Sequence, residues 1–156
     1  MGRDPVFNHM KINTILVPLD CTDRSQPLLH SASFLATQFD AQLVLLHVYQ
    51  FLEYVPAHMA AEDFDKYCVT MQQNAEQSLK ATQRECLREP KVQSAQLLTI
   101  KGFFEEEIFK VAEEIKADLI VVSTHGYTGI RRFMRGSKAA RLLRHAHSPI
   151  LILPNK

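Results

Sequence analysis

The sequence lacks the features that define several classes of protein. It has three cysteines, Cys21, Cys68 and Cys86, an odd number with no CxxC pair among them. This argues against a disulfide framework and against a zinc cluster, so we interpret all three as reduced thiols. No apolar run approaches the ~20 residues that a membrane helix needs, and the N-terminus carries no apolar secretory segment. We therefore expect a cytoplasmic protein with no membrane association.

Carboxylates are absent from the last quarter of the chain. Asp118 is the final acidic residue, and seven basic residues follow it, whereas the rest of the chain holds 11 basic and 17 acidic residues. The net charge of +1 therefore conceals a basic C-terminal segment. Such an asymmetry favours an anionic ligand there.

The usual phosphate-binding and metal-binding signatures are also missing. The sequence contains no GxxxxGK[ST], no GxGxxG after a predicted strand and no HExxH. A P-loop NTPase, a dinucleotide-dependent dehydrogenase and a zinc protease therefore have no support. His145 and His147 are two residues apart on a predicted helix and point to different faces, which argues against a metal site.

The composition is that of one globular domain. The 156 residues are 46% hydrophobic and 22% charged, close to the averages for such domains. Residues 1–9 carry no periodicity and precede a second methionine, Met10, so we interpret them as a remnant of cloning. We expect a single domain over residues 10–156.

Strands and helices are predicted to alternate along the chain. Five apolar stretches predict strands, at residues 11–19, 41–49, 94–100, 117–123 and 149–153. Helical periodicity predicts helices at residues 27–39, 61–88, 104–115 and 137–147. Core-facing positions are expected at Leu28, Ala32, Leu35 and Phe39 in the first helix, and along a stripe from Phe64 to Cys86 in the second. Nearly continuous apolar strands indicate burial on both faces, hence a doubly wound α/β fold with a parallel sheet.

Ligands of such sheets bind outside the carboxyl ends of the strands, where the strand order reverses. The candidate positions are Leu19 and Asp20 after the first strand, His47 and Val48 at the end of the second, and residues 123–136 after the fourth. Asp20 could accept hydrogen bonds from a ribose or approach Mg²⁺, or it could cap the turn that follows it.

The segment after the fourth strand holds three of the five glycines, Gly126, Gly129 and Gly136. Clustered glycines let backbone N–H groups form a concave anion site, and the first turn of a helix beginning at Gly136 and Ser137 favours a phosphate. The alternative is that the glycines serve as turn residues and that Ser137 caps the helix. The nearby cations Arg131, Arg135 and Lys138 favour the phosphate interpretation, although each alone could belong to a solvated face.

This segment resembles the ATP-binding members of the universal stress protein family. They carry Gly-x2-Gly-x9-Gly-Ser/Thr, which Gly126, Gly136 and Ser137 match, while Ser123 stands in place of the first glycine. Further similarities are ILVPLD at 15–20, LLHV at 45–48, the segment that follows Gly102, and RHAHSPILILP near the C-terminus. The resemblance covers residues 11–154.

The resemblance implies a Rossmann-like, open five-stranded parallel sheet of order 3-2-1-4-5 that binds ATP, with Mg²⁺ as an optional partner at Asp20. Pro18, Leu19 and Asp20 would line the adenine and ribose, and the main chain of Val48 would read the adenine edge. The remaining candidate residues for nucleotide binding are Ser123, Thr124, His125, Gly126, Gly129, Arg135, Gly136, Ser137 and Lys138. A side chain at position 123 is expected to crowd the ribose or the phosphates.

The resemblance implies a stress-response regulatory protein that holds an adenine nucleotide. We expect little or slow ATP turnover, because residues 126–137 contain no carboxylate and a general base would have to be Asp20 or His125. The alternative is a dimeric interaction module of the same family that binds no nucleotide. In both cases an edge strand at 149–153 predicts a homodimer. Nucleic-acid binding has less support, since the basic segment offers few aromatic residues.

Overall fold

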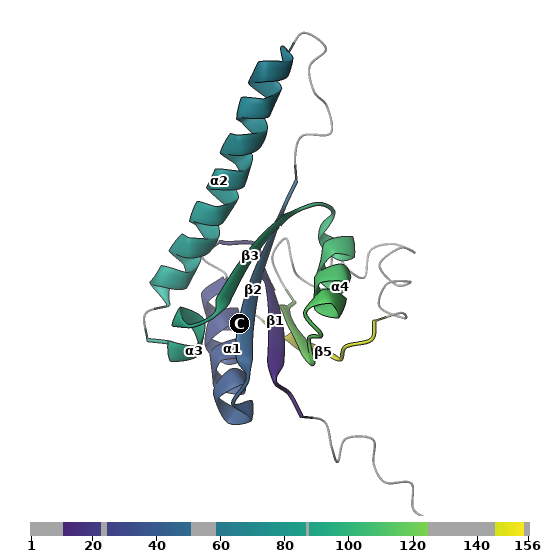
Figure 1. The fold of residues 1–156 in the computed structure, drawn as a ribbon. Helices are drawn as coiled ribbons and strands as arrows, with labels where there is room; N and C mark the ends of the chain where they lie inside the picture. Colours follow the sequence, from purple (N-terminus) through teal and green to yellow (C-terminus); the bar gives the residue numbers. More distant parts are fainter. Residues whose placement is uncertain (1–10, 23–24, 51–58, 87, 125–145, 155–156) are drawn as a thin grey trace, which may run out of the picture.

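The computed structural model describes residues 11–22, 25–50, 59–86, 88–124 and 146–154. Within them lies one five-stranded sheet of order β3-β2-β1-β4-β5, in which every pair of neighbours is parallel (Figure 1). Its strands are β1 (Thr14–Leu19), β2 (Gln42–Tyr49), β3 (Gln96–Lys101), β4 (Leu119–Ser123) and β5 (Ile150–Leu153). The predicted fold class and strand order are both confirmed.

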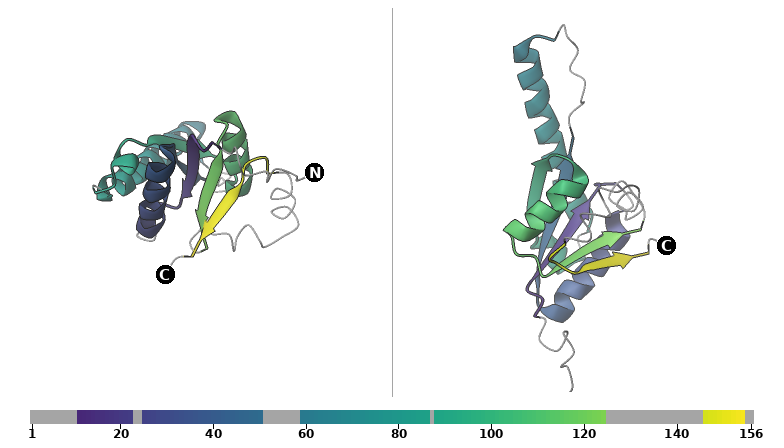
Figure 2. Two further views of the ribbon diagram at one scale, coloured as in Figure 1. Left: turned by 90° about the horizontal axis from the view of Figure 1, so that it is seen from below. Right: turned by 90° about the vertical axis from the view of Figure 1, so that its right-hand side faces the viewer.

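Helices cover both faces of this sheet. Those described are α1 (Ser25–Phe39), α2 (Ala61–Glu85), α3 (Pro90–Gln93) and α4 (Phe104–Glu114). In β1, Ile15 and Val17 pack in a core with α1, the end of α2 and α3, whereas Leu16 packs in a second core with α4. Figure 2 shows α4 on the opposite side of the sheet from α1. Burial on both faces explains why the strands read as unbroken apolar runs.

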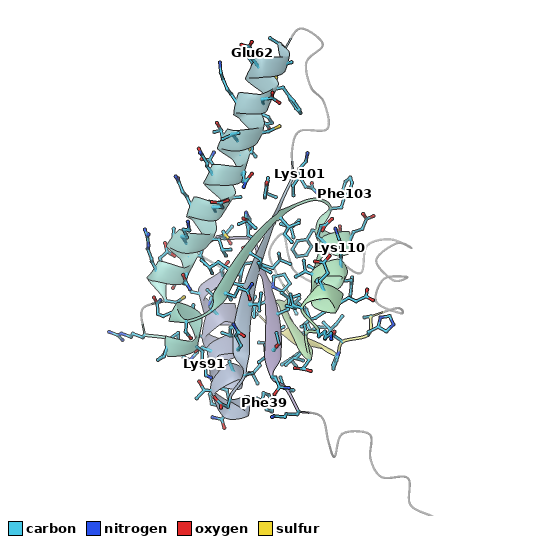
Figure 3. All side chains as sticks on the ribbon, viewed as in Figure 1. Phe39, Glu62, Lys91, Lys101, Phe103 and Lys110 are labelled. Carbon is cyan, nitrogen blue, oxygen red and sulfur yellow. The ribbon has the colours of Figure 1, made fainter. Side chains whose placement is uncertain are left out.

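The buried face of α1 differs from the prediction. Its buried residues are Ser25, Leu28, Leu29, Ala32, Ser33 and Ala36. Leu28 and Ala32 were expected there, but Leu35 is only half-buried and Phe39 is 45% exposed. The small side chains at positions 32, 33 and 36 let the helix approach the sheet closely, so the stripe is centred on them. Phe39 is the last residue of the helix and lies at its carboxyl end (Figure 3).

The helix predicted at 61–88 ends earlier, at Glu85, and a short helix that the sequence did not predict follows it. The N–H of Cys86 donates to the carbonyl of Gln83, and α3 begins at Pro90, whose missing N–H costs nothing at a first helical position. Hydrogen bonds from two side-chain amides hold α2 and α3 together. Gln83 Nε2 donates to the carbonyl of Val92 at 2.8 Å, and Gln93 Nε2 donates to the carbonyl of Gln83 at 2.7 Å.

The core-facing stripe of α2 is confirmed only for the second half of the helix. Ala75, Leu79 and Thr82 are buried, whereas Phe64, Cys68 and Met71 are only half-buried. The first half extends beyond the sheet in Figure 1 and in the right-hand view of Figure 2, and Glu62 lies near its far end (Figure 3). The apolar stripe predicted along α2 is therefore longer than the part of the helix that packs against the sheet.

The segment before β5 also corrects the prediction. A helix was expected through His147, but Ala146 and His147 are not helical, and residues 137–145 lie outside the described residues. The hydroxyl of Ser148 donates to the carbonyl of Ala117 at 2.7 Å and so holds this segment beside the start of β4. None of the described helices has both the length and the apolar character needed to cross a bilayer.

Candidate functional site

Strands β1 and β4 separate toward their carboxyl ends. Their ladder includes Ile15 paired with Leu119 and ends at Leu16 paired with Ile120, whereas β1 stays paired with β2 as far as Leu19. Pro18 falls in this stretch and has no N–H to donate to a neighbouring strand. The chain crosses from β1 to β2 on one side and enters β4 on the other, so the strand order reverses here. This is the position where ligands bind in doubly wound sheets.

Asp20 follows β1 directly and holds the turn into α1. Its Oδ1 accepts hydrogen bonds from the N–H of Thr22 at 3.2 Å, from the Thr22 hydroxyl at 2.8 Å and from the Ser25 hydroxyl at 3.1 Å. Cys21, between them, has a φ of 55°. Of the roles open to Asp20, capping this turn is therefore observed. The same contacts fix the carboxylate at the carboxyl end of the central strand.

His47 connects the ends of β1 and β2. Its Nδ1 lies 3.0 Å from the carbonyl oxygen of Leu19. Since a carbonyl can only accept, Nδ1 carries the proton, and in the neutral ring Nε2 is an acceptor. Sequence analysis placed His47 at a strand end but gave it no role. A histidine near the carboxyl end of an otherwise apolar strand was the available signal.

Ser123 is the last residue of β4 and is only 5% exposed. Successive side chains of a strand alternate between faces, so Ser123 lies on the same face as Leu119 and Val121, which pack in the core with α1. The N–H of Thr124 donates to the carbonyl of Leu153 at 2.9 Å and extends the pairing with β5. The Ser123 side chain thus belongs to the α1 face of the sheet.

Cys21 carries the most perturbed thiol beside these strand ends. Burial raises its pKa to about 11; a hydrogen bond with the Thr82 side chain opposes the increase, and the Asp20 carboxylate adds to it. The group is therefore a neutral thiol at physiological pH and a poor nucleophile. All three cysteines are free, as predicted.

The structure describes only part of the predicted nucleotide site. Pro18 and Leu19 are buried at the end of β1, and Val48 in β2 is half-buried and packs against the α4 side of the sheet. Seven candidate residues lie outside the described residues and stay predictions: His125, Gly126, Gly129, Arg135, Gly136, Ser137 and Lys138. In the described part of the chain, no three His, Cys, Asp or Glu side chains come together as a metal site.

The fold and the separation of β1 from β4 define a Rossmann-like α/β domain with its candidate site at the strands' carboxyl ends. The model of the universal stress protein family matches residues 11–154, and the chain belongs to this family. Universal stress protein A homolog 1 of Coxiella burnetii is 30% identical over 146 residues, which cover 91% of this chain and 96% of that protein. Universal stress protein MJ0531 of Methanocaldococcus jannaschii is 30% identical over 141 residues, covering 89% and 80%.

Solved structures share the fold. The crystal structure of a universal stress protein in complex with cAMP superimposes with a TM-score of 0.62 and 23% identity, covering 94% of this chain and 99% of that one. The agreement extends over essentially the whole domain. It supports the architecture described above.

Proposed function

We propose that this universal stress protein is a regulatory protein that binds an adenine nucleotide, ATP in the first instance, with little or slow turnover. The observation that carries the proposal is that β1 and β4 separate beside Asp20. In the sequence, the glycine-rich segment follows β4 directly. A structural neighbour solved with cAMP supports an adenine ligand in this fold.

The adenine and ribose would lie against the ends of β1 and β2. Pro18 and Leu19 offer apolar contact, and the main chain of Val48 offers a donor and an acceptor to the adenine edge. Asp20 would accept from a ribose hydroxyl.

The phosphates would lie against residues 123–138, whose glycines and cations form the basic segment of the sequence. Asp20 is the one carboxylate within residues 19–22, 47–50 and 123–138. These residues do not supply the several oxygen ligands of a protein Mg²⁺ site, so Mg²⁺ would enter with the nucleotide's own phosphates. The shortage of carboxylates also leaves few groups to act as a general base, which is why we propose slow turnover.

We further propose that the protein is a homodimer through β5. This strand is at the edge of the sheet, with Ile152 40% exposed. An exposed apolar edge strand is a template for pairing with another chain. The same observation favours the second candidate function, a dimeric interaction module that binds no nucleotide.

Calorimetric titration distinguishes the two functions. We expect the parent protein to bind ATP and the Gly126→Val variant to lose that binding, because a branched side chain would prevent close approach of the backbone to the ligand. Ala81→Val, which adds bulk to an exposed position of α2, is the control and should bind like the parent. No binding by either protein would favour the interaction module, whereas equal affinity of the parent and Gly126→Val would place the ATP site away from Gly126. Titration with cAMP, and with ATP with and without Mg²⁺, would define the ligand.

A further inference from the structure

A hydrogen bond from a side chain joins the carboxyl ends of β1 and β2. His47 lies opposite Leu19 in the register of the two strands, and its Nδ1 donates to the Leu19 carbonyl at 3.0 Å. Leu19 is 1% exposed, so its carbonyl lies largely out of water and is stabilised by a donor from the protein. The half-buried His47 ring supplies such a donor.

This contact fixes the peptide from which Asp20 departs. The Leu19 carbonyl and the Asp20 N–H belong to one planar peptide unit, so holding the carbonyl also holds the plane of that unit. The next residue, Cys21, has a φ of 55°, in the left-handed region that residues other than glycine rarely adopt. Such a conformation persists only where surrounding contacts hold it. The hydrogen bonds that the Asp20 carboxylate accepts hold the turn after Cys21, and His47 holds the strand end before it.

The same ring is next in sequence to the second group that we propose for nucleotide binding. Val48 follows His47 directly, just as Asp20 follows Leu19. Neighbouring strands lie about 4.8 Å apart, and the ladder between β1 and β2 extends as far as the pair of Leu19 and His47. A bond between these two residues therefore constrains the spacing between the Asp20 carboxylate and the Val48 main chain.

We infer that His47 is a positioning residue of the nucleotide site. Its Nδ1–H holds Leu19 so that Asp20 and the Val48 main chain can bind the ribose and the adenine at the same time. The inference rests on the proposed function and adds to it the residue that connects the two strand ends. Its contribution is made before binding, because groups that are already held in place do not have to be ordered when the ligand arrives.

The tautomer of His47 tests the contact in the protein without nucleotide. A neutral ring that donates from Nδ1 to a carbonyl carries its proton on Nδ1, and its Nε2 is unprotonated. Long-range ¹H–¹⁵N NMR spectra distinguish the two tautomers, and the loss of signals in His47→Asn identifies those of position 47. The expected result, at a pH where the ring is neutral, is the Nδ1–H tautomer. The Nε2–H tautomer would overturn the inference.

Substitutions at position 47 test what the contact does for binding. His47→Leu removes the donor and should weaken ATP binding by about 3- to 10-fold, the effect of one hydrogen bond. His47→Asn keeps an N–H close to the position of Nδ1 and should restore most of the affinity. The matched control is His30→Leu, which removes a ring whose Nδ1 lies 2.5 Å from Oε1 of Glu89. This control should bind ATP like the parent.

Calorimetric titration measures ATP binding by the parent and the three variants. If the parent binds ATP and His47→Leu binds it equally well, the proposed function stands and this inference fails. The inference also fails if His47→Asn binds no better than His47→Leu, since the hydrogen bond would then not be the cause. A parent that binds no ATP would reject the proposed function and, with it, the role of His47 in binding.

Discussion

At the scale of single residues, Asp118 joins the amino ends of β1 and β4. Its Oδ2 accepts from the N–H of Asn13 at 2.8 Å and of Thr14 at 2.9 Å, and its own N–H donates to the carbonyl of Thr14 at 2.9 Å. The ladder between β1 and β4 includes few residue pairs, and the hydrogen bonds of this carboxylate extend it at its amino end. The last acid of the sequence therefore has a structural role next to the central strand.

Replacing this carboxylate should weaken the whole domain. We expect Asp118→Ala to lower the free energy of unfolding by about 2–3 kcal/mol, because two backbone N–H groups lose a charged acceptor. Asp118→Asn, which keeps one oxygen, should cost less. Urea denaturation measures the loss, and Asp63→Ala, at an exposed position of α2, is the matched control. A loss for Asp118→Ala no larger than that of the control would contradict this role.

The raised pKa of Cys21 predicts how its reactivity depends on pH. Only the thiolate is alkylated readily, and with a pKa of about 11 the group stays protonated at pH 8. Iodoacetamide should therefore modify Cys21 slowly in the folded protein at pH 8, and faster as the pH rises toward 11. Peptide mass spectrometry measures the rate at each pH, with urea-unfolded protein as the reference. Equal rates for Cys21 in the folded and unfolded protein at pH 8 would show that the thiol is not protected.

At the scale of elements, α2 divides into a half that builds the core and a half that does not. Leu79 is 1% exposed in the α1-side core, whereas Val69 is 54% exposed in the part that extends past the sheet. Hydrophobic residues of similar type thus have different energetic roles within one helix. Leu79 should therefore contribute more than Val69 to the free energy of unfolding, because burial rather than helix propensity sets the contribution of each side chain.

Replacing each of these two side chains with alanine should show that only the second half of α2 stabilises the core. Leu79→Ala should lower the free energy of unfolding by about 2–4 kcal/mol through lost burial and a cavity, whereas Val69→Ala should change it by less than about 0.5 kcal/mol. Guanidinium denaturation of both variants measures the difference. Similar losses would mean that the first half of α2 is packed as tightly as the second.

The sequence predicted the type of these elements better than their packing. Apolar runs specify strands that are buried on both faces, and the strands were found within a few residues of their predicted bounds. Periodicity also identified α1 and α2, but a stripe does not say how far the opposing sheet extends, so the burial of Phe64 and Met71 was overestimated. Helix α3 was missed because its four residues are too few to carry a period.

At the scale of the whole molecule, the order of the strands in the sheet made it possible to predict where the site lies, but not the contacts within it. The reversal between β1 and β4 follows from the order, so the positions of Asp20 and Ser123 at strand ends could be predicted. The contacts of Asp20 with Thr22 and Ser25 could not, since they depend on a turn in which Cys21 has a positive φ. Nor could the face of Ser123, because the apolar run of β4 does not say which of its alternating side chains face α1.

Ligand binding to the folded domain should raise its thermal stability. ATP at about 100 times its dissociation constant would add about 2.7 kcal/mol, which for a domain of this size raises Tm by roughly 5–10 °C. Gly126→Val should show no such shift at the same ATP concentration, whereas Ala81→Val should keep it. Differential scanning fluorimetry measures all three. An equal shift in Gly126→Val would indicate that ATP binds elsewhere.

The amino-terminal end of α2 can change in length during evolution more easily than the rest of the described chain. Ala75 is the first residue that α2 buries, and the 14 residues from position 61 to 74 form about 20 Å of helix in which Phe64, Cys68 and Met71 are only half-buried. Residues 61–63 are exposed, so adding or deleting about one helical turn at this end would leave the sheet and the residues that α2 buries unaltered. The length of this end can therefore vary at little cost in stability. The same property makes it a natural place to graft a peptide or attach a reporter.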